Sequence, residues 1–295
     1  MTGRSETTST WTVMDVLDWS RHRFEALGLD SPRLDAELLL GRALGVKRIE
    51  LYTRFDQPLS DLERERVRAL VRRRMNREPV AYILGSKAFW TFEVVVDPRV
   101  LIPRPETEGI VERILAETDP EETGRFIDVG TGSGAIACAL ALERPRAKVS
   151  AIDISEAALQ VAETNARKLG CAVDFARSDL LAAVEDPATV VAANLPYIPR
   201  ADMASLQAEV QHEPALALDG GPDGLDLIRR LAEQAHERLA DRGLIVLEVG
   251  HDQADRTAEI LRQRDFDRVA VDNDLAGHPR VVWAQRPVRS GSTSR

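Results

Sequence analysis

Apolar residues follow two different patterns along the chain, and the change falls between residues 85 and 105. Up to residue 85 they recur at helical spacing, as in the segment after Ser31-Pro32, where the proline occupies the first helical position. A capping box at Ser60–Glu63 begins another helix, whose apolar residues also share one face. The pattern therefore predicts a small helical domain over residues 1–85.

The segment Phe89–Val96 is rich in aromatic and β-branched residues, which indicates a β-hairpin or an extended connector. Three prolines follow, at positions 98, 103 and 105, and they stiffen the chain before the next helix. We therefore expect residues 86–104 to link two domains.

From residue 105 onward, short apolar strands alternate with amphipathic helices. Strands are expected at Phe126–Val129, Lys148–Ile152, Val173–Arg177, Thr189–Ala193, Leu244–Glu248, Phe266–Val271 and Val281–Ala284. Helices are expected at Thr107–Thr118, Ala135–Glu143, Ser155–Lys168, Gly224–Ala240 and Gln253–Arg264. This alternation predicts an α/β domain over residues 105–286, built on a mostly parallel, doubly wound sheet with an antiparallel pair at its edge. The Ser/Gly/Arg-rich tail, residues 287–295, is expected to be disordered.

Charge divides in the same place as the hydrophobic pattern. The 295 residues include 39 basic and 48 acidic side chains, a net charge of −9, which disfavours a protein that coats nucleic acid. Up to Arg104 the count is 18 basic and 15 acidic, whereas from Pro105 it is 21 basic and 33 acidic. No signal peptide, membrane span or metal-ligand cluster is visible, so we expect a cytoplasmic protein without a metal site.

The helix that begins at Ser60 carries seven arginines between positions 64 and 77. The simpler interpretation is a solvated helix face balanced by neighbouring acids. The alternative is a docking surface for an acidic partner, and the sequence leaves both open.

A glycine-rich loop, Asp128 to Gly134, joins the first strand of the α/β domain to a helix. Its GxGxG pattern lets a ligand approach the backbone, but an acid at the strand end suits a cationic or hydroxyl-bearing ligand better than a phosphate. Asp153, at the end of the next strand, has the spacing of a ribose-binding carboxylate. Asp179, after the third strand, is placed to reach an adenine amino group. Together these features predict S-adenosylmethionine (SAM) as the cofactor, with a nicotinamide dinucleotide as the alternative that the glycines alone would allow.

The tetrapeptide Asn194-Leu195-Pro196-Tyr197 follows the fourth strand and has the (N/D)-x-P-(Y/F) pattern of enzymes that methylate a planar nitrogen. Such a nitrogen is a poor nucleophile because its lone pair is delocalised. The Asn194 side-chain oxygen and the Leu195 carbonyl can accept its two N–H bonds and direct the lone pair at the sulfonium methyl. Pro196 fixes the turn and Tyr197 offers a flat wall, so we expect all four residues to form the catalytic and substrate-binding loop.

With these residues in place, the chain resembles the HemK/PrmC family of protein-(glutamine-N5) methyltransferases, which act on peptide chain release factors. The resemblance extends from about Ser31 to Trp283. It is carried by the segments Pro79–Gly85, Asp97–Glu108, Asp128–Gly134, Ser178-Asp179, Asn194–Tyr197 and Glu213–Leu225, with Asp153.

The resemblance implies a small helical substrate-recognition domain, a β-hairpin linker and a Rossmann-like seven-stranded SAM-dependent methyltransferase domain. It implies methylation of the glutamine in the Gly-Gly-Gln motif of class I release factors, without a stable nucleic-acid partner. The implied cofactor-binding residues are Asp128, Gly130, Thr131, Gly132, Ser133, Gly134, Asp153, Asp179, Leu180 and Asn194. Besides the tetrapeptide, Phe89, Arg104, Glu106 and Thr107 are implied to border the substrate.

One position departs from the family, which usually has Asn-Pro-Pro-Tyr where this chain has Leu195. Asn-Leu-Pro-Tyr is also the form of ribosomal RNA adenine-N6 dimethyltransferases, so adenine methylation of RNA or DNA is an alternative. A SAM-binding module without catalytic activity is another. The residues around Arg104 and the loop at 220–225 favour the glutamine family.

Overall fold

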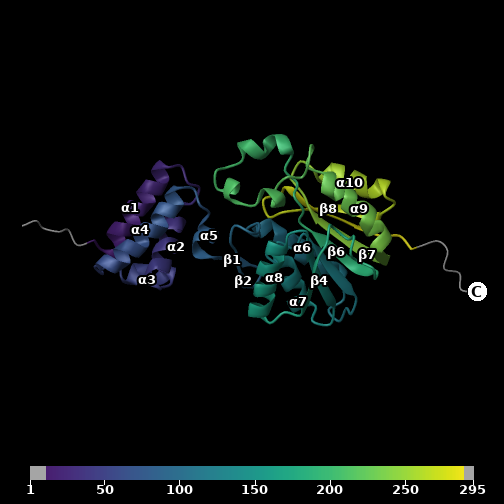
Figure 1. Ribbon diagram of the computed structural model, residues 1–295, viewed down its shortest axis with the longest axis horizontal. Helices are drawn as coiled ribbons and strands as arrows, with labels where there is room; N and C mark the ends of the chain where they lie inside the picture. Colours follow the sequence, from purple (N-terminus) through teal and green to yellow (C-terminus); the bar gives the residue numbers. More distant parts are fainter. Residues whose placement is uncertain (1–10, 289–295) are drawn as a thin grey trace, which may run out of the picture. The chain divides into compact units, whose positions relative to one another are not determined.

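The computed structural model describes residues 11–288, which form two compact units that divide between Gly85 and Ser86 (Figure 1). The expected disordered tail lies, from residue 289 onward, outside the described residues. Each unit has its own hydrophobic core and is described here by itself.

The first unit is helical, as the apolar spacing predicted. It contains α1 (Val13–Ala26), α2 (Pro32–Leu44), α3 (Arg48–Thr53), α4 (Asp61–Met75) and α5 (Val80–Leu84). Thr12 and Ser60 begin α1 and α4 with capping boxes, in which the hydroxyl accepts from the backbone N–H three residues on. Phe24, Leu39 and Leu40 lie fully buried where the helices meet.

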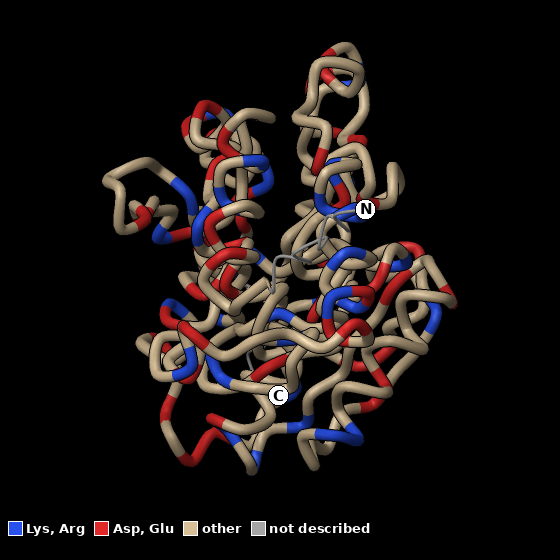
Figure 2. Tube along the Cα trace, turned by 90° about the vertical axis from the view of Figure 1, so that its left-hand side faces the viewer, with Lys and Arg blue, Asp and Glu red and all other residues tan. Residues whose placement is uncertain are grey.

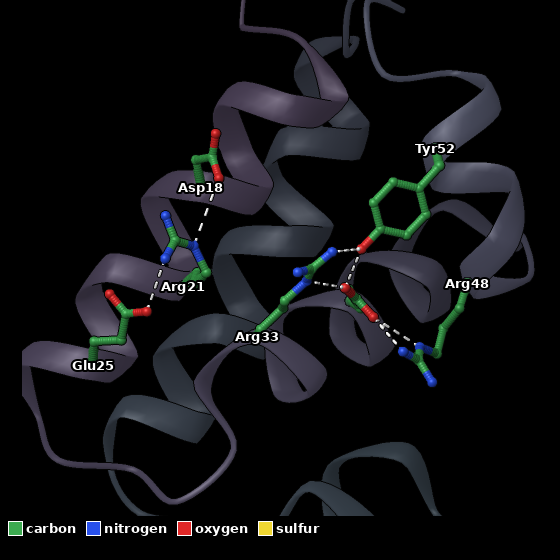
Figure 3. Close-up of polar contacts among 7 residues, drawn as sticks. Asp18, Arg21, Glu25, Arg33, Arg48 and Tyr52 are labelled. Atoms are coloured by element: carbon green, nitrogen blue, oxygen red, sulfur yellow. Dashed lines mark hydrogen bonds and ion pairs between the residues drawn. The ribbon is translucent and has the colours of Figure 1, made fainter.

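The helical unit buries a carboxylate, that of Glu37, whose side chain is only 2% exposed. Arg33, Arg48 and Tyr52 converge on it (Figure 3). The guanidinium Nε atoms of Arg33 and Arg48 each lie 2.9 Å from one of its oxygens, and the Tyr52 hydroxyl also donates to it. Burial alone would raise the pKa of Glu37, but these hydrogen bonds outweigh burial and lower it.

The arginines of α4 divide among several roles. Arg74 is buried and donates to Asp35 at 2.7 Å, whereas Arg73 pairs with Glu78 and Arg64 with Asp61. Figure 2 shows basic and acidic positions interspersed along the helices. The pairs of Arg64 and Arg73 match the interpretation of a solvated, balanced helix face, whereas buried Arg74 does not belong to that face.

The second unit begins with a β-hairpin, β1 (Ser86–Phe89) and β2 (Phe92–Val95), joined by a two-residue turn. Asn165, on a later helix of the same unit, is fully buried and binds this hairpin. Its amide accepts from the Val95 N–H at 2.7 Å and donates both to the Val95 carbonyl at 3.0 Å and to the Ser133 carbonyl at 2.8 Å. One side chain therefore joins the hairpin to the glycine loop.

A seven-stranded sheet in the order β5-β4-β3-β6-β7-β9-β8 forms the centre of the second unit. Its strands are β3 (Arg125–Val129), β4 (Lys148–Asp153), β5 (Val173–Arg177), β6 (Ala188–Ala193), β7 (Leu239–Glu248), β8 (Asp267–Asn273) and β9 (Pro279–Gln285). The first five are parallel, and β9 pairs antiparallel with both β7 and β8. This confirms the predicted doubly wound sheet and its antiparallel edge.

Helices pack on the sheet in two sets (Figure 1). The first set is α6 (Glu108–Glu117), α7 (Ala135–Glu143) and α8 (Glu156–Leu169), and the second is α9 (Asp226–Arg238) and α10 (Ala254–Gln263). Because strand residues alternate between faces, Ile127 and Val129 pack in the core with α9 and α10, while Asp128 faces α7. No helix within residues 11–288 is long and apolar enough to cross a membrane.

The boundary between α9 and β7 differs most from expectation. The helix expected at Gly224–Ala240 begins only at Asp226 and ends at Arg238, and β7 starts at Leu239 instead of Leu244. Arg242 has a positive φ of 62°, and the pairing of β6 with β7 shifts register nearby. The irregular backbone there hides the start of the strand from a periodicity argument.

Candidate active site

A cavity of about 250 Å³ lies at the carboxyl ends of β3, β4, β5 and β6, on the edge where parallel sheets bind ligands. Its lining includes the predicted residues Thr107, Gly130, Thr131, Gly132, Ser133, Asp153, Asp179, Leu180, Asn194, Leu195 and Pro196. It also includes residues to which the sequence assigned no role, among them Arg99, Val100, Leu216 and Arg230. Most of the predicted positions therefore meet around one space.

The glycine loop approaches the tetrapeptide closely at Gly130. Its φ is +71°, and a Cβ built there would lie 3.0 Å from the Leu195 side chain, so a larger residue would push Leu195 out of place. The N–H groups of Gly130 and Thr131 both donate to the Ile152 carbonyl, at 2.8 and 3.0 Å. Gly134 ends the loop and begins α7 as its N-cap.

Asp153 ends β4 and lines the cavity. Its two carboxylate oxygens accept from the N–H groups of Gly132 and Ser155, each at 2.9 Å, which holds the side chain in one orientation. Burial raises its pKa, and these backbone hydrogen bonds act in the opposite direction. A fixed carboxylate at this position can accept further hydrogen bonds from paired hydroxyl groups.

Asp179 and Leu180 follow β5 and line the next part of the cavity. One Asp179 oxygen accepts from Arg230 of α9 at 2.7 Å, in a pair that is about half exposed. Leu180 adopts a positive φ of 50° and is buried beside Asp179. Asp179 and Leu180 thus place a polar acceptor and an apolar surface side by side.

Two of the predicted cofactor residues, Asp128 and Gly134, do not line the cavity, and Asp128 is fully buried. The register explains why: Asp128 pairs with Ala151, so Asp153 lies two residues closer to the carboxyl edge. Asp128 instead accepts from the Thr131 hydroxyl at 2.6 Å and the Ala137 N–H at 3.1 Å. Burial raises its pKa to about 7. Through these two hydrogen bonds, Asp128 connects the glycine loop to the first turn of α7.

Asn194 follows β6 and lines the cavity together with Leu195 and Pro196. Its Nδ2 donates to the Thr107 hydroxyl at 3.1 Å, which turns the side-chain oxygen away from Thr107. Thr107 stands at the start of α6 and is itself buried. The amide is therefore held in one orientation by a residue 87 positions away in the chain.

Tyr197 is not part of the cavity lining in this structure, although its side chain is largely buried. Burial raises its pKa to about 12, so the phenol stays protonated. Its backbone carbonyl accepts from Gln253 Nε2 at 2.8 Å, and a Cβ on Gly224 would lie only 2.2 Å from that carbonyl oxygen. The sequence did not point to the Gln253 hydrogen bond, which fixes the end of the tetrapeptide, and only glycine at position 224 leaves room for the Tyr197 carbonyl.

Three other predicted substrate residues lie outside the lining. Phe89 is buried in β1 against Phe92, and Glu106 is exposed. Arg104 pairs with Glu213, whose second oxygen accepts from the Ile102 N–H at 3.0 Å. Glu213 therefore fastens the loop after the tetrapeptide to the segment before α6.

Glu248 is a further candidate that the sequence pattern does not reveal, because it stands as the last residue of an apolar strand. It is 2% exposed at the end of β7, next to the tetrapeptide strand. Burial is the main reason that its pKa rises to about 7, while the Thr107 hydroxyl and Arg280 act to lower it. A carboxyl residue inside an otherwise apolar strand end was the available signal.

The chemistry of the cavity fits SAM. A ribose and an adenine amino group need acceptors, which Asp153 and Asp179 provide, and a sulfonium needs nearby oxygens rather than cations. The backbone at Gly132 is open, since a Cβ there would meet nothing within 4 Å. Apolar side chains such as Leu180 and Ile154 offer surface for a ring.

Comparison with known proteins agrees with this chemistry. Residues 110–213 match the family model described as methyltransferase small domain, and residues 15–85 match the PrmC N-terminal domain. A methyltransferase structure from Pyrococcus furiosus shares the fold, with a TM-score of 0.51 and 17% identity over 68% of this chain and 92% of its own. The fold and the site thus define a SAM-dependent methyltransferase.

Two curated relatives narrow the class. A release factor glutamine methyltransferase from Koribacter versatilis is 41% identical over 279 residues, which cover 94% of this chain and 99% of the relative. One from Neisseria gonorrhoeae is 43% identical over 262 residues, covering 88% and 95%. The chain belongs to the family of release factor glutamine methyltransferases.

Proposed function

We propose that this protein transfers the methyl group of SAM to the side-chain amide nitrogen (N5) of a glutamine in peptide chain release factors. The observation that carries the proposal is the fixed amide of Asn194, whose oxygen is turned away from Thr107 at the wall of the cofactor cavity. The names of the relatives, release factor glutamine methyltransferases, support the choice of substrate.

SAM, when bound, supplies a methyl group on a sulfonium, which is a strong electrophile. The Asn194 oxygen and the Leu195 carbonyl would accept the two N–H bonds of the substrate amide and point its nitrogen at that methyl. Gly130 and Leu195 are in close approach, so the cofactor loop and the substrate loop share one wall. Catalysis in this arrangement comes from positioning and from oxygen atoms that stabilise the developing charge on nitrogen.

For the remaining residues we propose the roles that the family pattern implies. Gly130 to Gly134, Asp153, Asp179 and Leu180 would bind SAM. Arg104 and Glu106 would border the protein substrate at the rim, beyond the cavity.

The partner would be a class I release factor with a Gly-Gly-Gln motif, and the methylation would modulate translation termination. The helical unit, residues 1–85, would recognise that partner. Because release factors act on ribosomes, the proposal puts the enzyme in the cytoplasm.

The test is methyl transfer from labelled SAM to a purified release factor, compared with the same factor after Gln→Ala substitution in Gly-Gly-Gln. We expect label only in the unsubstituted factor. Asn194→Ala should lower the rate at least about 100-fold while SAM still binds, because one of two oriented acceptors is lost. Asn273→Ala, at an exposed strand end, is the control and should leave the rate unchanged.

Equal labelling of both factors would reject glutamine as the target. Transfer to ribosomal RNA or DNA, with none to protein, would favour the adenine alternative. Full activity of Asn194→Ala would reject the catalytic role of the tetrapeptide.

A further inference from the structure

A groove of about 220 Å³ lies between α1 and α4, entirely within the helical unit. Valines form most of its buried lining, Val16 on α1 and Val67 and Val71 on α4, and none of them is more than 8% exposed. A cavity of about 150 Å³ is enough to hold a benzene ring. The α1–α4 groove therefore has room for one aromatic or branched apolar side chain of another molecule.

Two tryptophans also line this groove, Trp11 just before α1 and Trp19 within it. Trp19 is 47% exposed, although tryptophan is highly buried on average. Tryptophan and arginine are among the residue types that contribute most of the binding energy in protein–protein interfaces. An exposed tryptophan beside an apolar groove is thus typical of a contact surface.

The charged residues in the lining of the groove are both cationic, Arg64 and Arg68 of α4. Arg64 pairs with Asp61, but its Nε atom is buried and has no hydrogen-bond partner within residues 11–288. No carboxylate in this part of the chain pairs with Arg68. Arg72 lies one turn further along the same face of α4 and is exposed, so positive charge continues beyond the groove. These cations fit a partner that presents acidic side chains beside an apolar one.

The lining of the groove fits a protein better than a nucleic acid. Binding to nucleic acid depends on many Lys and Arg contacts with phosphates, whereas the groove offers two arginines and a largely apolar buried surface. The chain up to Arg104 has 18 basic and 15 acidic residues, a small excess for a phosphate-binding domain. An acidic protein segment with an apolar side chain matches both properties of the groove.

We propose that the α1–α4 groove docks an acidic segment of the release factor. One aromatic or branched side chain of that segment would sit against the valines, and its acidic neighbours would pair with Arg64 and Arg68. This inference rests on the proposed function and adds to it the surface that recognises the partner and the chemistry of its counterpart. The arginines of α4 then have separate roles, since Arg73 pairs with Glu78 within the unit while Arg68 is available for docking.

Steady-state kinetics with a purified release factor separate docking from the methyl transfer. Arg68→Glu reverses the charge at the groove, and Trp19→Ala removes an aromatic wall. Each should raise KM for the release factor about 10- to 100-fold and leave kcat and KM for SAM within about twofold. An increase of salt from about 50 to about 300 mM should raise KM of the wild type more than KM of Arg68→Glu, because screening weakens a pair that the variant lacks.

Arg66→Glu is the matched control, the same change at an exposed arginine of α4 outside the groove lining. Two residues along an α-helix are about 200° apart around its axis, so Arg66 and Arg68 lie on different sides. Arg66→Glu should leave KM for the release factor within about twofold of the wild type. Trp19→Phe should retain most of the affinity, because it keeps an aromatic wall. If Arg68→Glu has the wild-type KM, or if both charge reversals raise KM equally, the proposal is wrong.

Direct binding of the release factor to the full chain, measured by biolayer interferometry, needs no methyl transfer. We expect Kd to rise about 10- to 100-fold in Arg68→Glu and in Trp19→Ala, and to stay near the wild-type value in Arg66→Glu. Thermal unfolding followed by circular dichroism checks that all variants are folded, which the exposure of the three side chains favours. If the wild type methylates no release factor, the proposed function fails, yet Kd still decides whether the groove docks that factor.

Two other occupants of the groove would be recognised by their own results, and each would overturn the proposal. Ribosomal RNA that binds more tightly than the release factor, and loses affinity in Arg68→Glu, would identify a nucleic-acid surface. Residues 1–10 contain one apolar side chain, Met1, and one acid, Glu6. Their removal should leave Kd for the release factor unchanged. Tighter binding after their removal, with no effect of Trp19→Ala in the full chain, would assign the groove to the chain's own N-terminus.

Discussion

The helical unit and the catalytic unit each bury a glutamate, and they treat it in opposite ways. Glu37 receives hydrogen bonds from Arg33, Arg48 and Tyr52, which lower its pKa despite burial. Glu248 is equally buried, but one of its oxygens has no partner within residues 11–288, and its pKa rises to about 7. A fully compensated buried charge serves the structure, whereas an incompletely compensated one is poised to change its charge near neutral pH.

The largest change in stability that would test this comparison is expected from Glu37→Ala. Three donors lose their common acceptor and a small void remains, so the helical unit should lose about 3 kcal/mol of stability. Hydrogen exchange followed by mass spectrometry should show about 100-fold faster exchange in the slowest helices of residues 11–85, with residues 86–288 unchanged.

The control for Glu37→Ala is Glu25→Ala, since Glu25 pairs with Arg21 on the exposed side of α1. It should change stability by less than about 0.5 kcal/mol. Equal effects of the two variants would mean that the hydrogen bonds to Glu37 contribute no more to stability than a surface ion pair does.

Glu248→Gln is expected to change stability by an intermediate amount, and this change should depend on pH. A raised carboxyl pKa means that the folded protein binds this proton more tightly than the unfolded chain, so the wild type loses stability as pH rises from 4.5 to about 7. The variant has no such proton. The variant should therefore gain stability relative to the wild type as pH rises: its free energy of unfolding minus that of the wild type should be about 2 kcal/mol larger at pH 8 than at pH 5.5.

Urea denaturation at the two pH values measures this difference. Asp128 also has a pKa raised to about 7, so the wild type and the variant share its contribution and only the difference between them reports on Glu248. A difference that does not depend on pH would show that Glu248 has an ordinary pKa, and the contrast with Glu37 would disappear.

The smallest change in stability is expected at the N-terminal caps of the helices. In the helical unit the Ser60 hydroxyl accepts from the Glu63 N–H, whereas α7 of the catalytic unit begins at Gly134 without a side-chain cap. Ser60→Ala should destabilise α4 by about 1 kcal/mol, and Ser60→Thr should retain most of the stability. Local exchange rates of α4 amides measure both. Equal rates in the two variants would show that solvent caps α4 as well as the hydroxyl does.

The sequence predicted the architecture because the strands of the catalytic unit are short apolar runs between clear helix signals. It also predicted the tetrapeptide and the cofactor loop, most of whose residues line one cavity, although Tyr197, Asp128 and Gly134 do not. Asp128 and Asp153 look alike in the sequence, since each is an acid at a strand end. Only the register of β3 against β4 places one beneath the loop and the other on the cavity.

Glu248 and Gln253 could not be found from the sequence for a different physical reason. Gln253 donates to the Tyr197 carbonyl, and Glu248 lies beside the end of the tetrapeptide strand; both neighbours are more than 50 positions away in the chain, and no local pattern encodes such proximity. Glu248 also sits at the end of an apolar strand, where periodicity assigns it to the core. Long-range polar contacts of this kind are visible only after the sheet has brought the strand ends together.

Asn165 joins the hairpin to the glycine loop entirely through backbone atoms, the N–H and carbonyl of Val95 and the carbonyl of Ser133. Main-chain groups are the same whatever side chains surround them. Side chains of the hairpin can therefore vary without disturbing the hydrogen bonds that join it to the glycine loop.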